Sequence, residues 1–184
     1  MPDISKCAVA TVAAVVAIGI AIASLVPSNR QCTIKISNFS SRKLVNPKLY
    51  ISSGHCYRMP PLEIPSKRET IVEFRKTALT ATGAVGVFTY NLCSPQSDCS
   101  TKVAYMFSVP YDFNLYSNWH AVGLFGADMS TNKYLYEYMY YENNVRFTRE
   151  KAGKYITYVD GGFKFFSTMA NTYTPEMTLE IHDL

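Results

Sequence analysis

Alternation of apolar and polar positions from residue 30 onward predicts a series of short β-strands. In CTIKISNF (32–39), Cys32, Ile34 and Ile36 alternate with polar residues, as in a strand with one buried face. ATGAVGVFTYNL (81–92) and KVAYMFSV (102–109) are apolar almost throughout, which predicts strands buried on both faces. Further strands are predicted at TIVEFRK (70–76), AVGLF (121–125), YITYV (155–159), FKFFSTM (163–169) and MTLEIH (177–182). Their spacing, with turn signals between them, predicts a β-sandwich or barrel.

One stretch of this region favours a helix. MSTNKYLYEYMYY (129–141) begins with Ser130 and Thr131, either of which can cap a helix. Tyr136 and Tyr140 would then lie one turn apart on the same helix face. Were the stretch a strand, alternate tyrosines would share one face. Several phenol rings are therefore expected to point the same way in either case.

The first 29 residues form a separate hydrophobic segment. Its uncharged run from Cys7 to Val26 would be about 30 Å long as a helix, which matches the hydrocarbon core of a bilayer. Three interpretations remain open: a cleaved signal peptide, a permanent membrane anchor, and a helix stored against a soluble body and released into membrane later. The residues by themselves favour the signal peptide by a small margin.

Length, charge and cysteines narrow the function classes. The 184 residues suit one domain, and a net charge of +4 without a Lys/Arg run argues against nucleic acid as a partner. None of the five cysteines follows zinc-site spacing, so no metal site is predicted. Cys93 and Cys99 flank a short loop that a disulfide could close. Cys32 and Cys56 could pair if their strands are neighbours.

Aromatic residues gather in a segment that otherwise has the composition of a loop. MFSVPYDFNLYSNWH (106–120) holds five aromatic rings and one charged side chain, Asp112. Such rings can hold a quaternary ammonium group, at roughly 0.5–2 kcal/mol per ring, and Ser53 or Ser108 could donate to a neighbouring phosphate. No catalytic histidine context, carboxylate pair or phosphate-binding loop is present. The chain is therefore not predicted to be an enzyme or to need a cofactor.

Four blocks carry a family resemblance. ATGAVGV, FSVPYDFNLYSNW, YEYMYY and LEIH resemble, in order and spacing, the actinoporins, which are pore-forming cytolysins of sea anemones, and more closely the actinoporin-like proteins of fish. The likeness covers residues 30–184. It implies a mainly β fold, a β-sandwich flanked by two α-helices, here with a hydrophobic N-terminal helix. It also implies a secreted or soluble protein that binds sphingomyelin and phosphatidylcholine in a target cell membrane and forms a homo-oligomer there.

The resemblance also implies site residues. Eight positions match the phosphocholine site of the family: Ser53, Val85, Ser108, Pro110, Tyr116, Tyr136, Tyr140 and Tyr141. Trp119 matches its interfacial tryptophan, whereas Leu115 and His120 stand where anemone members usually have Trp; all three are expected at the membrane interface. Arg30 falls at the basic residue that ends the family's N-terminal segment. RFT, from Arg146, replaces the Arg-Gly-Asp of anemone members.

The N-terminus departs most from the family, in which an amphipathic helix with acidic residues lines the pore. Here the run from Cys7 to Val26 carries no acid, and the expected inserting or pore-lining positions are Cys7, Thr11, Gly19, Ser24 and Val26. The resemblance nevertheless raises the inserting helix above the signal peptide. The alternative function is a recognition module of the same fold that binds choline lipids or carbohydrate and forms no pore.

Overall fold

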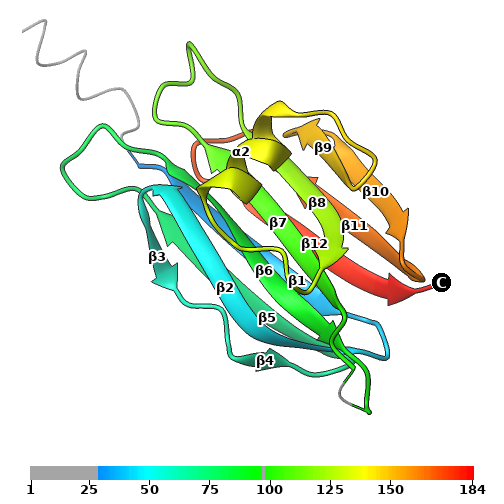
Figure 1. The fold of residues 1–184 in the computed structure, drawn as a ribbon. Coiled ribbons are helices and arrows are strands. Elements are labelled where there is room, and N and C mark those ends of the chain that lie inside the picture. Colours follow the sequence, from blue (N-terminus) through cyan, green and yellow to red (C-terminus); the bar gives the residue numbers. More distant parts are fainter. Residues whose placement is uncertain (1–28, 97) are drawn as a thin grey trace, which may run out of the picture.

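The computed structural model describes residues 29–96 and 98–184, which form a sandwich of two β-sheets (Figure 1). The first sheet consists, in spatial order, of β10 (Tyr155–Asp160), β11 (Phe163–Met169), β12 (Glu176–Asp183), β1 (Gln31–Asn38), β5 (Arg68–Arg75) and β3 (His55–Arg58). The second consists of β4 (Glu63–Ile64), β2 (Lys43–Ser53), β6 (Ala84–Cys93), β7 (Thr101–Val109), β8 (Trp119–Gly126) and β9 (Phe147–Lys151). β1 and β12 pair in parallel, and the other neighbours are antiparallel. The predicted sandwich is confirmed.

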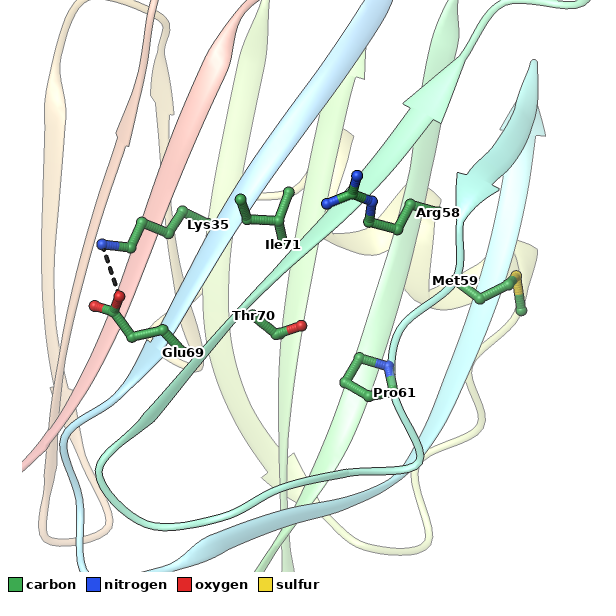
Figure 2. A pocket seen from close by; sticks show the side chains of 7 residues that line it. All are labelled: Lys35, Arg58, Met59, Pro61, Glu69, Thr70 and Ile71. Carbon is green, nitrogen blue, oxygen red and sulfur yellow. Dashed lines mark ion pairs between the residues drawn. The ribbon is translucent and has the colours of Figure 1, made fainter.

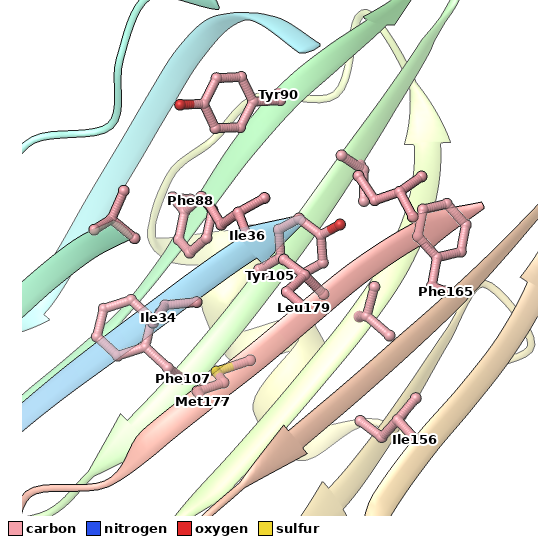
Figure 3. Close-up of a cluster of buried hydrophobic side chains, with 14 of the residues drawn as sticks. Ile34, Ile36, Phe88, Tyr90, Tyr105, Phe107, Ile156, Phe165, Met177 and Leu179 are labelled. Carbon is pink, nitrogen blue, oxygen red and sulfur yellow. The ribbon is translucent and has the colours of Figure 1, made fainter. Parts of the chain in front are cut away.

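The space between the sheets is filled by branched and aromatic side chains (Figure 3). Ile34 and Ile36 of β1 are fully buried there, which confirms the alternation of that strand. The ring of Phe107 stacks on that of Phe74, from the opposite sheet, with centroids 4.2 Å apart. Since stacked aromatic rings bury large apolar areas, this pair contributes strongly to the cohesion of the two sheets.

A second apolar layer covers the outer face of the second sheet. The helix α2 (Lys133–Tyr141) packs there, with Leu135 and Met139 fully buried. β6 and β7 consequently have protein on both faces and are buried along almost their whole length, as their sequences predicted.

The start of α2 differs from the prediction. Its N-cap is Asn132, whose side-chain oxygen accepts from the backbone N–H of Leu135 at 3.1 Å. Thr131 is engaged elsewhere, since its hydroxyl lies 2.6 Å from that of Thr89 on β6. A tertiary hydrogen bond therefore occupies one expected cap, and the next polar residue takes its place. The predicted helix itself is confirmed.

The hydrophobic N-terminal segment lies outside the described residues. The second predicted helix and the expected pore-lining positions also lie outside the described residues: Cys7, Thr11, Gly19, Ser24 and Val26. In the part of the chain that the structure describes, no helix combines the length and apolarity needed to cross a bilayer.

The cysteines follow the strand order. Cys93 and Cys99 form a disulfide across the β6–β7 loop. Cys32 and Cys56 are both free cysteines. Cys32 on β1 and Cys56 on β3 both pair with Phe74 of β5, which lies between these two strands. Two strand spacings separate them, about 10 Å, which exceeds the reach of a disulfide. Their strands are not neighbours, so the condition for pairing is not met.

The stacked core pair yields a test of the fold. We expect Phe107→Ala to lower the free energy of unfolding by about 3–5 kcal/mol, because it leaves a cavity between the sheets. Tyr155→Ala, at an exposed site on β10, is the control and should change it by less than about 0.5 kcal/mol. Urea unfolding followed by fluorescence measures both. Equal losses would show that the sheets are not held together through this stack.

Candidate headgroup site and membrane-facing surface

A row of cross-strand neighbours forms the floor of the candidate site. Ser53 on β2 pairs with Val85 on β6, Val85 with Ser108 on β7, and Ser108 with Trp119 on β8. Side chains of directly paired residues project from the same face of a sheet. Val85 packs in the apolar layer beneath α2, so the row lies on the helix-covered face. The row thereby brings together three predicted phosphocholine residues and the predicted interface residue Trp119.

An irregularity in β2 turns Ser53 toward this face. Tyr50 pairs with Val87, and Ser53 pairs with Val85. Three positions along β2 therefore correspond to only two positions along β6. The extra residue is a β-bulge, which allows Tyr50 and Ser53 to share a face although they are an odd number of positions apart. The hydroxyl of Ser53 then accepts from the backbone N–H of Gly83 at 3.0 Å.

The tyrosines of α2 lie over this row. Tyr136 and Tyr140, one turn apart as predicted, have ring centroids 5.6 Å apart, and Tyr141 meets Tyr140 edge-on at 4.8 Å. Ser108 lies close enough to Tyr136 and Tyr140 to lower the pKa of both phenols. The predicted residues of the helix and of the sheet therefore meet at Ser108.

Burial controls the protonation of these phenols. It raises the pKa of Tyr136 and of Tyr140 above the usual value, neighbouring phenols raise it further, and Ser108 lowers it in part. Both phenols are consequently neutral at physiological pH. Neutral rings present their electron-rich faces to a cation, and neutral hydroxyls can donate to a phosphate oxygen.

The loop of residues 110–118 forms the exposed edge of the site. Tyr116 and Leu115 project into solvent with 57% and 73% of their surfaces exposed. Tyr116 lies near enough to Tyr140 to raise the pKa of that phenol. The loop thus combines an exposed leucine with an exposed tyrosine that lies near the half-buried Tyr140.

A buried arginine anchors this loop. Nε of Arg30 donates to the carbonyl oxygens of Pro110 and Tyr111, each at 3.0 Å. Its guanidinium also lies over the rings of Tyr173 and Phe113, at 4.5 and 5.1 Å from their centroids. The basic residue that the resemblance placed at the end of the N-terminal segment therefore holds the loop of residues 110–118, with Pro110 as one of its contacts.

His120 does not belong to the exposed surface, and its expected place at the membrane interface was wrong. It is fully buried, because consecutive strand residues point to opposite faces and Trp119 takes the outer one. Its Nε2 lies 3.1 Å from the carbonyl oxygen of Lys154, to which it donates, and Nδ1 accepts from the hydroxyl of Ser167 at 2.9 Å. Burial lowers the pKa of His120 to about 4.

Three neighbours of the site were not predicted from the sequence. Tyr50 places its ring 6.3 Å from that of Tyr136. The charged ends of Arg149 and Lys151 lie 5.0 and 5.4 Å from the ring centroid of Trp119. Arg149 and Lys151 could have been found from the sequence, because Phe147, Arg149 and Lys151 are spaced by two residues and would share one face of a strand. The position of Tyr50 depends on the β2 register, which the sequence does not reveal.

A groove of about 490 Å³ lies away from this site, along the outer face of the first sheet (Figure 2). Lys35 and Glu69 form an ion pair of 2.9 Å within it, and Arg58 and Met59 border it. It contains none of the predicted site residues. Among residues 29–96 and 98–184, no group of three or more His, Cys, Asp or Glu side chains is placed to hold a metal ion.

Comparison with known proteins shows the family of the chain. The family model described as sea anemone cytotoxic protein matches residues 7–183. The chain belongs to this family, the actinoporins. It is 35% identical over 114 residues to deep sea actinoporin Cjtox II of Cribrinopsis japonica, covering 61% of this chain and 49% of that protein. The chain spans about half the length of several curated relatives that it matches.

Two further proteins extend the comparison. Bryoporin of Physcomitrium patens is 28% identical over 153 residues, which cover 83% of this actinoporin and 84% of bryoporin. The crystal structure of the lipid binding protein Nakanori matches with a TM-score of 0.66 at 12% identity, covering 83% of this chain and 70% of that one. At such low identity the second likeness shows a shared fold alone.

The buried histidine predicts an acid-sensitive fold. The folded-state pKa of His120, about 4, lies below the value near 6.5 of an unfolded histidine, so the unfolded chain binds more protons between these pH values. Stability from this group is therefore present above pH 6.5 and is lost as the pH falls toward 4. Between pH 7.5 and 4.5, we expect the free energy of unfolding of the wild type to fall by about 2–3 kcal/mol more than that of His120→Gln.

Urea unfolding at the two pH values measures this difference. Carboxylates titrate alike in both proteins, so subtracting the two losses isolates the contribution of the imidazole. If His120→Gln loses as much stability as the wild type on acidification, the histidine is not the acid-sensitive group.

Proposed function

We propose that this actinoporin is a membrane-binding, pore-forming cytolysin that recognises phosphocholine headgroups, with sphingomyelin preferred. The observation that carries the proposal is the meeting of Ser108 with Tyr136 and Tyr140 above the Ser53–Val85 pair. Family membership and the relative named as an actinoporin support the same conclusion.

The geometry supports a division of roles within the headgroup. The choline ammonium would lie against the faces of Tyr140, Tyr141 and Tyr116, which surround the exposed side of the site. The phosphate would accept from the hydroxyls of Ser108 and the tyrosines. Leu115 would enter the interfacial layer of the bilayer beside them, because its side chain is apolar and exposed to solvent.

In the proposed sequence of events, docking precedes insertion. The domain of residues 30–184 would bind the target membrane from a secreted or soluble form, and several copies would then oligomerise. Residues 1–29 would insert as the pore-forming segment. The run from Cys7 to Val26 has no acidic side chain, so it would line a pore without the acid-based cation selectivity that the family resemblance implies.

The second candidate function is a recognition module that binds choline lipids or carbohydrate without forming a pore. The uncharged N-terminal run favours it, because a water-filled pore needs a polar lining. The groove of Figure 2, with charged side chains beside Met59, is a separate surface on which a carbohydrate could bind. Both candidates share the headgroup site and differ in whether the bilayer is breached.

Substitution of exposed rings tests the headgroup site. We expect Tyr116→Leu with Tyr141→Leu to weaken binding to vesicles of phosphatidylcholine and sphingomyelin about tenfold or more, because leucine keeps an apolar surface but has no π face. Tyr134→Leu is the matched control, since this equally exposed tyrosine of α2 stacks on Tyr138 and is not a predicted site residue. Surface plasmon resonance measures the affinities. Undiminished binding by the double variant, with an unchanged melting temperature, would contradict the site.

Dye release separates the two candidate functions. The full-length chain should empty vesicles that contain sphingomyelin and leave those of phosphatidylcholine alone largely intact. Binding without any release would refute pore formation and leave the recognition module as the function.

A further inference from the structure

The loop between β5 and β6 contains a leucine whose side chain is exposed and whose backbone has a positive φ. Leu79 is fully exposed, with a relative exposure of 104%, and its backbone has φ of +59°. This left-handed region is disfavoured for bulky L-residues, whose Cβ crowds the following carbonyl oxygen. Packing against other side chains does not offset the strain, because the side chain is wholly in solvent. A strained and exposed residue of this kind indicates a functional role.

Threonine hydrogen bonds hold the loop in this shape. The backbone N–H of Thr77 donates to Oγ1 of Thr82 at 3.0 Å, and Oγ1 of Thr80 donates to the carbonyl oxygen of Thr77 at 2.8 Å. The hydroxyls of Thr80 and Thr82 lie 2.8 Å apart. The turn is thus fixed from within, and Leu79 is held at its tip before any ligand is present.

The base of the loop adjoins the candidate headgroup site. Gly83 donates its backbone N–H to the hydroxyl of Ser53, and a Cβ built on Gly83 would lie 2.3 Å from the carbonyl oxygen of Val109. At the other end of the loop, Nζ of Lys76 lies 5.4 Å from the ring centroid of Tyr111. In Figure 1 the β5–β6 loop and the loop of residues 110–118 extend from the same end of the sandwich.

The composition of the loop suits a lipid surface. Residues 77–81 read TALTA and carry no charge, and Lys76 precedes them at the base. A short apolar tip with a lysine at its base matches the depth profile of a bilayer, in which acyl chains lie below the phosphates. One protruding side chain offers far less area than a stable protein–protein interface needs, which favours lipid over protein as the occupant.

We propose that the β5–β6 loop is a second membrane-inserting element, with Leu79 entering the upper acyl region of a phosphocholine bilayer beside the headgroup site. This inference rests on the proposed membrane-binding function. The two loops would flank the bound headgroup, one on the side of Ser53 and the other on the side of Tyr116. Headgroup recognition and apolar insertion would then act together on the same lipid patch.

Replacement of the leucine by glycine separates membrane affinity from folding. Glycine adopts a positive φ without steric cost, so Leu79→Gly should leave the free energy of unfolding unchanged or raise it. Its affinity for phosphatidylcholine–sphingomyelin vesicles should nevertheless fall about tenfold, because the inserted side chain is lost. Leu62→Gly is the control, since Leu62 is exposed too and lies next to β4, which pairs with the opposite end of β2 from Ser53.

Insertion depth gives a second readout. Leu79→Trp and Leu62→Trp, each made together with Trp119→Phe, carry a single tryptophan whose fluorescence reports contact with brominated acyl chains. Bromines near the glycerol end should quench the tryptophan at 79 and leave that at 62 unaffected. If the wild type binds vesicles but Leu79→Gly binds as tightly, or the tryptophan at 79 is not quenched in a variant that still binds, the inference fails and the proposed function stands. If the wild type itself does not bind, both fail.

Discussion

Packing of α2 against the outer face of the second sheet fixes the geometry of the candidate site. Leu135 and Met139 lie between the helix and the strands, so the helix cannot rotate without exposing them. Their burial determines the direction of Tyr136 and Tyr140, which follow at helical spacing and meet Ser108 on β7. The central strands are thus covered on both faces, and the candidate headgroup residues lie where the helix meets the outer face of the second sheet.

The parts of this arrangement that depend on periodicity could be predicted from the sequence. Alternation at Ile34 and Ile36 and the continuous apolar runs of β6 and β7 indicated two packed layers. The rule that consecutive strand residues face opposite ways also applied to Trp119 and His120, and it shows why both could not lie at the membrane. Family resemblance had assigned His120 by position in a motif, and the local geometry of β8 overrides that assignment.

Other features depend on contacts that no local pattern encodes. The bulge that turns Ser53 toward Tyr50 follows from how β2 pairs with β6. The choice of Asn132 as cap follows from a hydrogen bond between Thr131 and a distant strand. β2 also escaped prediction because Pro47 interrupts it, and the register shift between Val45 and Lys48 accommodates that proline. Each feature arises from tertiary pairing, which one sequence without its partner strands cannot show.

Arg30 connects three segments of the described chain. Its guanidinium is bonded to the backbone of the loop of residues 110–118, while its own peptide group continues into β1. Its carbonyl oxygen also accepts from the N–H of Lys76, at the base of the β5–β6 loop. The two loops and the start of β1 therefore share one residue, Arg30, so a displacement of either loop would act directly on the first strand of the sandwich.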